Sequence, residues 1–452
     1  MKNKTLQIFF ILLGMAATTH FLVQLKFIAF FEDYLIYTRI ILYGFATYYC
    51  YQKKSLTSWI LFSMVLGIEV GYTFPQFASQ LKVISKIFLR LIKTIIAPLL
   101  IATLSLGIAG HSDLKQLGRI AWKSFLYFEI VTTIALFIGI AAINLSKAGV
   151  GINLPLESSH EKVEVVKQTW EDIVLHIFPE NIAKSISEGQ ILQVVIFSII
   201  FGIALALVKD KFKLPMIGFL ESLSEVMFKF TSIIMYFAPF AVFAAIAYTV
   251  GHMGLGILFN LLNLLATLYA ALFALILFVF VPIALYCRIN IIKFASAISE
   301  PVSIAFATTT SEAALPKAMI ALESLGASRK IISFVMPMGY SFNLDGSTLY
   351  LSLASVFVAQ AAGIDLSIGQ QMLMVFTLML TSKGVAGVPR ATLVVLLGTA
   401  VSFGLPVEPI FIILGIDELM DMGRSSINVI GNCLATLAIA RWEGELHPPV
   451  KS

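Results

Sequence analysis

Charged residues are scarce in this sequence. Lys, Arg, Asp and Glu make up only 13% of its 452 residues, whereas about 25% is usual in a soluble domain. With 59% hydrophobic residues and a mean hydropathy of +0.92, the chain has too little polar surface to remain in solution. This composition excludes a soluble enzyme, a disordered scaffold and a secreted disulfide-rich domain, and it indicates a polytopic membrane protein.

Cysteines and familiar catalytic motifs are also few. The sequence has only three cysteines, Cys50, Cys287 and Cys433. An odd number of widely spaced cysteines fits neither a disulfide framework nor a metal site. The sequence has no HExxH, GxxxxGK or GxSxG motif, so the residues of the common hydrolases and ATPases are missing. We therefore expect no enzyme, no cofactor and no nucleic-acid partner.

The chain has long apolar segments instead. A helix needs about 20 apolar residues to cross the hydrocarbon core of a bilayer. The candidate spans lie near 5–24, 34–51, 57–74, 84–110, 118–145, 190–208, 217–250, 253–287, 331–363 and 409–440. These spans predict an all-α polytopic membrane protein with eight core helices and two extra N-terminal helices. The uncharged run of 35 residues from Met253 to Cys287 exceeds a straight span, so we expect it to tilt or bend.

Basic residues cluster in alternate connections between the spans. They are Lys2, Lys4, Lys53, Lys54, Lys115, Arg119, Lys123, Lys209, Lys211, Lys213, Arg288, Lys293, Arg329 and Lys330. The positive-inside rule places all of them, and both termini, in the cytoplasm. We expect a multi-pass protein of the cell inner (plasma) membrane, with the lipid bilayer as its surroundings.

Two segments, 294–322 and 369–407, have a different pattern. In each, two apolar arms meet at a tip rich in hydroxyl groups or glycine, at 308–316 and 382–389. Backbone amides at such a tip would be unpaired in hydrocarbon unless the tip lined a cavity within the protein. We therefore predict two re-entrant helical hairpins.

The two hairpins look like repeats. A Pro-basic-Ala triplet begins at Pro316 and again at Pro389, 73 residues later. Polar motifs begin at Asn343 and Asp417, which are 27 and 28 residues after these prolines. Paired broken segments in two repeats indicate a transporter whose binding site lies at the repeat interface.

The last span holds Asp417, Asp421, Arg424, Asn428 and Asn432. At about 100° per residue, these side chains lie within roughly 80° of one another on a helix. A charge at the centre of a membrane helix costs about 2.5–3.5 kcal/mol, so this polar stripe predicts a functional cavity. The alternative is an internal salt-bridge network, because Arg424 is at helical spacing from both aspartates. As a site, the stripe offers a guanidinium for a carboxylate and Asp421 for an ammonium group.

Three further acidic residues are candidates for ion coupling. Asp345 is the only charged residue of its span, beside Asn343, Gly346 and Ser347, and it indicates a cation cage or a protonated site. Gly346 would allow local unwinding of this helix. Glu129 within a span and Glu312 at the first tip are either proton carriers or structural partners of other groups.

These motifs together resemble the dicarboxylate/amino acid:cation symporter family, also called the glutamate transporter family. The similarity lies in Thr-Ser-Glu-Ala-Ala-Leu-Pro at 310–316, Asn-Leu-Asp-Gly-Ser at 343–347, and the segments 384–389 and 417–432. Four motifs in the family's order and spacing, over about residues 57–443, make the resemblance specific.

The resemblance implies a homotrimer that works by an elevator mechanism, with the second hairpin as the extracellular gate. Its domains would be a 1–56 extension, 57–117 scaffold helices, a 118–150 transport-domain helix, a 151–250 extracellular loop with scaffold helices, a 251–443 transport domain with both hairpins, and a 444–452 cytoplasmic tail.

The resemblance also implies site residues. Those expected to contact substrate are Thr310, Ser311, Ser347, Val388, Asp421, Arg424, Ser425 and Asn428. Those expected to take part in cation or proton coupling are Glu129, Glu312, Gly339, Asn343, Asp345, Ser382 and Asn432, with Asn343 and Asp345 as candidate sodium ligands.

Arg424 and Asp421 together favour glutamate or aspartate, because family members for neutral amino acids differ at the arginine and those for C4-dicarboxylates tend to lack the aspartate. Sodium-driven members carry an aspartate in place of Asn432 and a hydroxyl in place of Val131. We therefore expect a secondary active symporter for acidic amino acids that is driven mainly by protons, with proton and/or sodium as coupling ion. The alternatives are a sodium-coupled or C4-dicarboxylate symporter and, in another class, a ligand-binding membrane sensor.

Overall fold

The described part of the protein is helical. A computed structural model describes residues 32–109, 114–152, 178–188, 191–381 and 391–446. Within these ranges all the regular secondary-structure elements are helices. The only β-type pairing there is one isolated bridge between Ala327 and Leu446. This confirms the all-α prediction.

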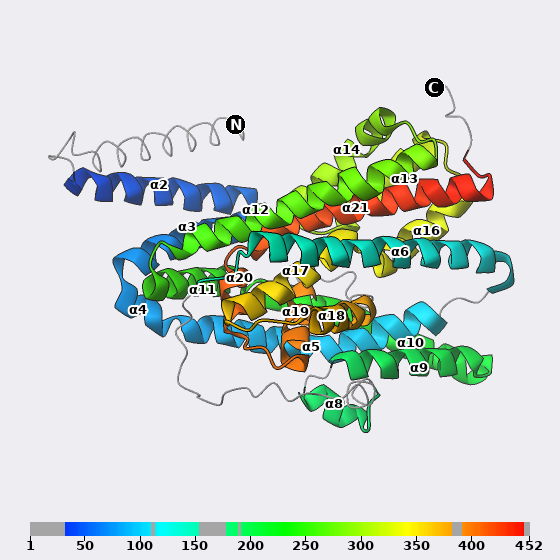
Figure 1. Cartoon of the computed structure of the whole chain (residues 1–452), viewed down its shortest axis with the longest axis horizontal. Helices are drawn as coiled ribbons and strands as arrows, with labels where there is room; N and C mark the ends of the chain where they lie inside the picture. The colour runs from blue at the N-terminus through cyan, green and yellow to red at the C-terminus, as the bar shows by residue number, and fades with distance from the viewer. Residues whose placement is uncertain (1–31, 110–113, 153–177, 189–190, 382–390, 447–452) are drawn as a thin grey trace.

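The helices follow one another in a long series (Figure 1). The first part contains α2 Glu32–Lys53, α3 Leu56–Thr73, α4 Pro75–Gln80, α5 Lys82–Ala109, α6 Leu114–Ser146, α8 Ile182–Glu188, α9 Ile191–Leu207, α10 Asp210–Met235 and α11 Ala238–Met253. The second part contains α12 Ile257–Leu275, η2 Ile276–Phe280, α13 Val281–Tyr286, α14 Ile291–Thr308, η3 Glu312–Ala314, α15 Leu315–Ser324, α16 Arg329–Phe342, α17 Asp345–Ala361, α18 Ile368–Thr381, α19 Ala391–Ser402, α20 Glu408–Leu414 and α21 Asp417–Glu443.

Several of these helices can cross a membrane. Four segments of the described residues are long and apolar enough by themselves: Leu56–Thr73, Arg119–Ser146, Ile257–Tyr286 and Ile291–Thr308. The helices α10 and α11 pass the same test as a pair, but they are bent by 48°. The segment 217–250, expected as one span, is thus two helices. Pro239 in the first turn of α11 explains the break, because it has no N–H to continue the helix from α10.

Of the other expected spans, 84–110 and 190–208 form the continuous helices α5 and α9 over their described residues, and three more are helical with local interruptions. In the run 253–287, where we expected tilting or bending, a π-helical turn, η2, lies between α12 and α13. The span 331–363 is interrupted between α16 and α17, and the span 409–440 between α20 and α21. Of the two extra N-terminal spans, 5–24 lies outside the described residues. The other forms the helix α2, which is not among the helices that pass the membrane test.

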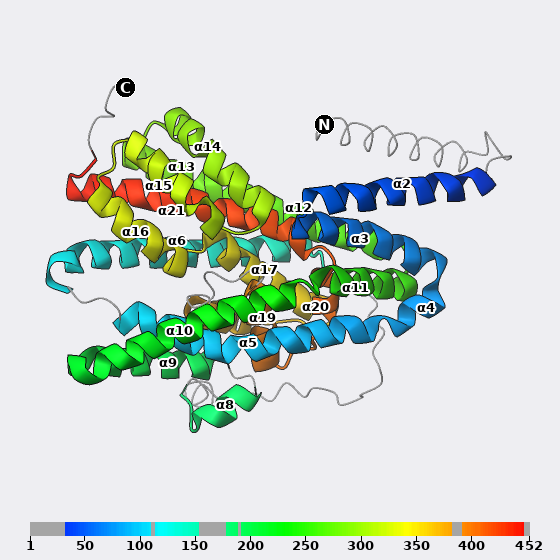
Figure 2. The same ribbon diagram turned by 180° about the vertical axis from the view of Figure 1, so that it is seen from behind.

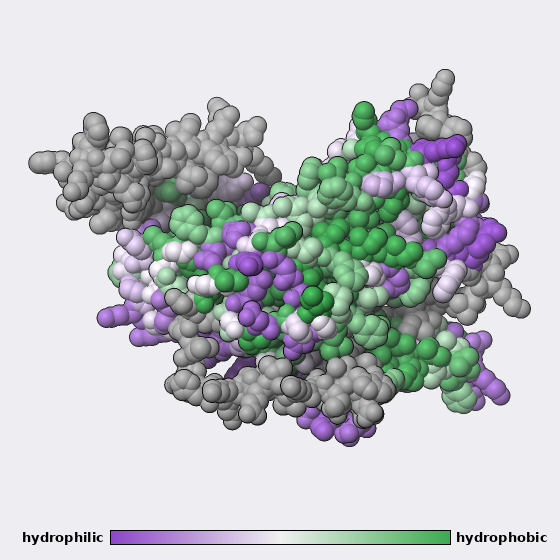
Figure 3. Space-filling view, in the orientation of Figure 1, coloured by the Kyte–Doolittle hydropathy of each residue, from purple (hydrophilic) through white to green (hydrophobic). Residues whose placement is uncertain are grey.

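The helices pack in two groups (Figures 1 and 2). In one group, α3 and α4 pack on α11, and α5 packs on α9, α10 and α11. In the other, α6 and α21 both pack against α17, and α12, α14 and α16 complete their surroundings. Apolar side chains cover α12, α13 and much of α6 on the face shown in Figure 3. An apolar surface of this kind is expected where a protein meets lipid or another subunit.

One end of the molecule gathers basic residues. The start of α6, the end of α21 and the turn between α9 and α10 all lie at this end, on the right in Figure 1 and on the left in Figure 2. There Glu443 of α21 accepts hydrogen bonds from Arg119 Nε at 2.9 Å and from Lys123 Nζ at 2.6 Å. These ion pairs tie the end of α21 to α6.

Candidate functional site

The polar stripe on α21 lies inside the protein. Asp417, Asp421, Arg424, Asn428 and Asn432 are all buried, and none is more than 6% exposed. Their side chains reach α16 and α17, which pack against α21. The five side chains therefore form a polar interior and do not face lipid.

Arg424 is held by two carboxylates. Its Nε donates to Asp421 Oδ1 at 2.7 Å, and its Nη1 donates to Asp417 Oδ1 at 3.1 Å. Ser425 Oγ also donates to Asp421 Oδ1, at 3.2 Å. The internal salt-bridge network is therefore present, and both aspartates take part in it. A ligand carboxylate that reached Arg424 would compete with these two aspartates for its N–H groups.

Tyr350 on α17 belongs to the same network, although the sequence analysis did not single it out. The Arg424 guanidinium carbon lies 4.3 Å from the centre of the Tyr350 ring, and the Tyr350 hydroxyl donates to Asp417 Oδ1 at 3.3 Å. The spacing could have revealed it, because Tyr350 lies three residues after Ser347 and so on the same face of α17. A cation over an aromatic face is favourable, most of all away from water.

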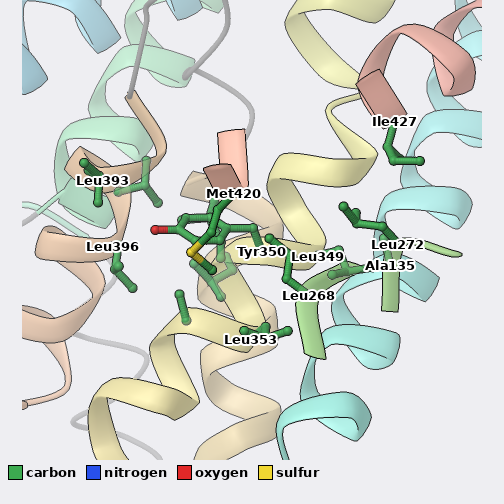
Figure 4. Packing of buried hydrophobic residues seen from close by; sticks show 14 of the residues in the cluster. Ala135, Leu268, Leu272, Leu349, Tyr350, Leu353, Leu393, Leu396, Met420 and Ile427 are labelled. Atoms are coloured by element: carbon green, nitrogen blue, oxygen red, sulfur yellow. The ribbon is translucent and has the colours of Figure 1, made fainter. Parts of the chain in front are cut away.

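Apolar residues surround Tyr350, the aromatic partner of Arg424. Figure 4 shows Tyr350 and Met420 near Leu349 and Leu353 of α17, with Leu268 of α12 beside them. All five side chains are fully buried. Coulombic interactions are stronger in such surroundings than in water. Glu418, a further acidic residue that the sequence analysis passed over, is also buried in the first turn of α21.

Asn428 joins α21 to the start of α17. Its Oδ1 accepts hydrogen bonds from the backbone N–H groups of Gly346 at 2.9 Å and Ser347 at 3.2 Å. Its Nδ2 donates to Ser347 Oγ at 2.9 Å. Asn428 thus satisfies amides in the first turn of α17 that have no partner within the helix. A Cβ atom on Gly346 would collide with the Arg424 backbone, so the two helices could not approach this closely with any other residue there.

A second polar cluster lies one turn further along α21. Asn343 Nδ2 donates to Asp345 Oδ2 at 3.0 Å and to Asn432 Oδ1 at 3.1 Å. Asn343 Oδ1 and Asn432 Nδ2 are buried and have no hydrogen-bond partner within the described ranges. Gly339 packs directly against the Asn432 amide, and Gly431 against the Asp345 carboxylate. The cluster therefore has one carboxylate, two amides and unused polar atoms.

The helix break beside this cluster differs from the expectation. The sequence placed local unwinding at Gly346, but α16 ends at Phe342 and α17 begins at Asp345. The two residues between them, Asn343 and Leu344, have non-helical φ/ψ values of −124°/68° and −100°/63°. Gly346 is part of α17 and serves the close approach to Arg424. The prediction of an interrupted helix was correct, and its position was wrong by two residues.

The first hairpin tip also reaches α21. Ser311 is buried, and its Oγ lies 3.5 Å from the backbone oxygen of Ser425. Thr310 Oγ1 donates to Thr308 Oγ1 at 3.1 Å, so this hydroxyl is bound within the hairpin. Glu312 is exposed. Of the expected substrate contacts on this tip, Ser311 is the one beside the stripe.

The other expected site residues have more varied positions. Ser382 and Val388, in the second hairpin tip, lie outside the described residues. Glu129 is partly buried on α6, which packs against α17. Val131 is buried two residues further along α6. No group of three or more His, Cys, Asp or Glu residues able to hold a metal ion occurs in the described part of the chain.

The chain is similar in sequence to known proteins over most of its length. Residues 56–442 match the sodium:dicarboxylate symporter family. The chain is similar to a proton/sodium-glutamate symport protein of Bacillus caldotenax, with 42% identity over 409 residues that cover 88% of this chain and 96% of the relative. A proton/glutamate-aspartate symporter of Escherichia coli (strain K12) is 40% identical over 86% of this chain and 93% of its own. A C4-dicarboxylate transport protein of Bacillus subtilis (strain 168) is 39% identical over 87% and 94%.

Proposed function

We propose that this chain, which belongs to the sodium:dicarboxylate symporter family, imports acidic amino acids together with protons. It is an integral membrane transporter of that family, and not an enzyme. The observation that carries the finer proposal is the buried pair of Asp421 and Arg424, 2.7 Å apart. An amino acid with a side-chain carboxylate has one cationic and two anionic groups, and this pair offers a partner for one of each sign.

Each residue of the site has a role in this proposal. Arg424 binds the side-chain carboxylate of the substrate, and Asp421 binds its ammonium group. Substrate binding releases Arg424 from Asp421, while Asp417 and Tyr350 continue to hold it. The remaining contacts come from Ser311 and Thr310 on the first hairpin, Ser347 on α17, Ser425 and Asn428 on α21, and Val388 on the second hairpin.

The second cluster favours proton coupling. A bound Na⁺ prefers a shell of oxygen atoms, and it gains from each carboxylate that the site supplies. Here the amide of Asn343 points its N–H groups at Asp345 and Asn432, and Asn432 adds no charge. The Val131 side chain supplies no oxygen either. We assign proton coupling to Glu129, with Glu312, Gly339, Asp345 and Ser382 in supporting positions, and we retain Asn343 and Asp345 as the residues that would hold Na⁺.

We further propose an elevator mechanism in a homotrimer of the plasma membrane. The group of α3, α4, α5, α9, α10 and α11 corresponds to the scaffold, and the group around α17 and α21 corresponds to the transport domain, with the second hairpin as gate. Arg119 and Lys123, which pair with Glu443 at the end of α21, support a cytoplasmic location for this end of the molecule and for the C-terminus. The re-entrant course of both hairpins is part of the same proposal.

The substrate is tested by competition in proteoliposomes that contain the purified chain. We expect unlabelled glutamate and aspartate to compete with labelled glutamate at concentrations at least about tenfold lower than succinate, which corresponds to about 1.4 kcal/mol. In the Asp421→Asn variant this preference for glutamate and aspartate should shrink. The variant lacks the carboxylate that binds their ammonium group, and succinate has no such group, so its binding should change less. Equal or better competition by succinate in the wild-type chain would favour C4-dicarboxylate transport, the activity in the name of the Bacillus subtilis relative.

A further inference from the structure

A strained residue forms the tip of the first hairpin. Thr309, between α14 and η3, has φ 54° and ψ 25°, in the left-handed region. Only four non-glycine residues in the described ranges have positive φ: Lys54, Lys147, Arg288 and Thr309. Thr309 is the one with a β-branched side chain, for which this conformation is least favourable. Helices usually place Gly or Asn at such a position.

Hydrogen bonds within the tip support this conformation. Thr309 Oγ1 donates to the backbone oxygen of Thr308 at 2.7 Å. Thr308 Oγ1 donates to the oxygen of Ile304 at 2.8 Å, and Thr310 Oγ1 donates to Thr308 Oγ1 at 3.1 Å. The three consecutive threonines thus bind one another and their own backbone. A glycine at 309 would lack the strain, but it would also lack the hydroxyl and would make the tip less rigid.

The left-handed turn determines where the next residues lie. The chain reverses at Thr309, and Ser311 follows as the buried residue whose Oγ lies 3.5 Å from the Ser425 backbone oxygen on α21. The Ser311 oxygen then accepts from Ala314 N at 3.0 Å, which starts the second arm of the hairpin. Strained backbone that the surrounding structure maintains is often part of a functional site.

We infer that Thr309 is a positioning residue: its hydroxyl-supported left-handed turn holds Ser311 and the adjacent amides in the orientation in which they receive the substrate. Thr309 itself makes no contact with substrate in this account. The inference rests on the proposed function for the identity of the substrate, because Ser311 is taken there as a substrate contact.

Three variants of the full-length chain test this inference, with glutamate uptake in proteoliposomes and the melting temperature as separate readouts. In Thr309→Gly, the melting temperature should stay the same or rise, while KM rises about tenfold (about 1.4 kcal/mol) and kcat changes little. Thr309→Asn, which tolerates the left-handed region and retains a polar side chain, should have a KM within about twofold of the wild type. Thr309→Val, which keeps the shape without the hydroxyl, should lose both stability and affinity.

A merely structural residue would change stability and KM together. A Thr309→Gly variant with wild-type KM, or a Thr309→Asn variant as poor as Thr309→Val, would overturn the inference. The proposed function fails separately, if the wild-type chain binds succinate but not glutamate. The same order of the variants, measured then as Kd for succinate, still decides the role of Thr309. A wild-type chain that binds neither probe overturns both.

Discussion

The two halves of the stripe on α21 differ in how their charges are balanced. In the first half, Arg424 lies between Asp417 and Asp421, and every one of these charged groups has a charged partner. In the second half, the Asn343 amide links Asn432 of α21 to the carboxylate of Asp345 on α17: its Nδ2 donates to Asp345 Oδ2 and to Asn432 Oδ1. Both halves are buried. The first half lies against the start of α17, where Gly346 contacts the Arg424 backbone, and the second half contacts Asn343 in the break between α16 and α17.

In the proposed function, the two halves have different ligands. The first half contains a cation whose partners can be exchanged, and we propose that it binds the charged organic substrate. The second half contains one carboxylate and two neutral amides, and we propose that it is coupled to protons, because a site with a single carboxylate offers a metal cation less negative charge than a site with two. Three substitutions test this comparison.

The largest effect is expected from Arg424→Cys. The substitution removes the only cation between two buried aspartates, and loss of one partner of a buried ion pair costs about 3–5 kcal/mol. Glutamate uptake in proteoliposomes should fall by at least about 100-fold. The matched control is Arg329→Cys, because Arg329 also pairs with a carboxylate, Glu323, but its side chain is 87% exposed. Uptake by the control should stay near the wild-type rate. Unchanged uptake by Arg424→Cys would refute the assignment of the substrate site.

Asn432→Asp should change the coupling ion. A second carboxylate beside Asp345 should increase the affinity for Na⁺, and we expect stimulation of uptake by Na⁺ to rise about tenfold (about 1.4 kcal/mol). Uptake with Na⁺ varied at constant pH measures this change. Asn144→Asp is the control, because it adds the same charge at an exposed position on α6. If Asn432→Asp responds to Na⁺ no more than Asn144→Asp does, the second half of the stripe is not the position where a carboxylate would create a Na⁺ site.

Gly346→Ala should have the smallest effect of the three. The added Cβ would meet the Arg424 backbone, which cannot move as a side chain can, and overpacking of this kind costs about 1–3 kcal/mol. We expect a lower melting temperature and a lower uptake rate, measured on the same preparation. Gly218→Ala on α10 has open space around its Cβ, so its stability should be unchanged or higher. A Gly346→Ala variant as stable as this control would contradict the close packing of α17 on α21.

Sequence reasoning found the residues whose position depends on local periodicity. The side chains of Asp417, Asp421, Arg424, Asn428 and Asn432 share a face because their spacing on a helix requires it. The existence of most helices followed from apolar segment length in the same way. These features need no knowledge of what packs against the helix.

Features that depend on contacts between distant segments were missed or misplaced. The helix break was expected at Gly346, but that glycine serves its contact with Arg424, 78 residues away, and the break is at Asn343 and Leu344. Tyr350 was overlooked because its role depends on Arg424 of another helix. In contrast, Pro239 was a local signal for the bend after α10 that the count of apolar residues did not use.

Uptake of labelled glutamate with the pH gradient and the Na⁺ gradient imposed separately tests the central claim most directly. An inwardly directed proton gradient without Na⁺ should drive accumulation, and a Na⁺ gradient at equal pH should drive little. Accumulation that requires Na⁺ and ignores the pH gradient would contradict proton coupling, and no accumulation under either gradient would contradict the proposed transport of glutamate.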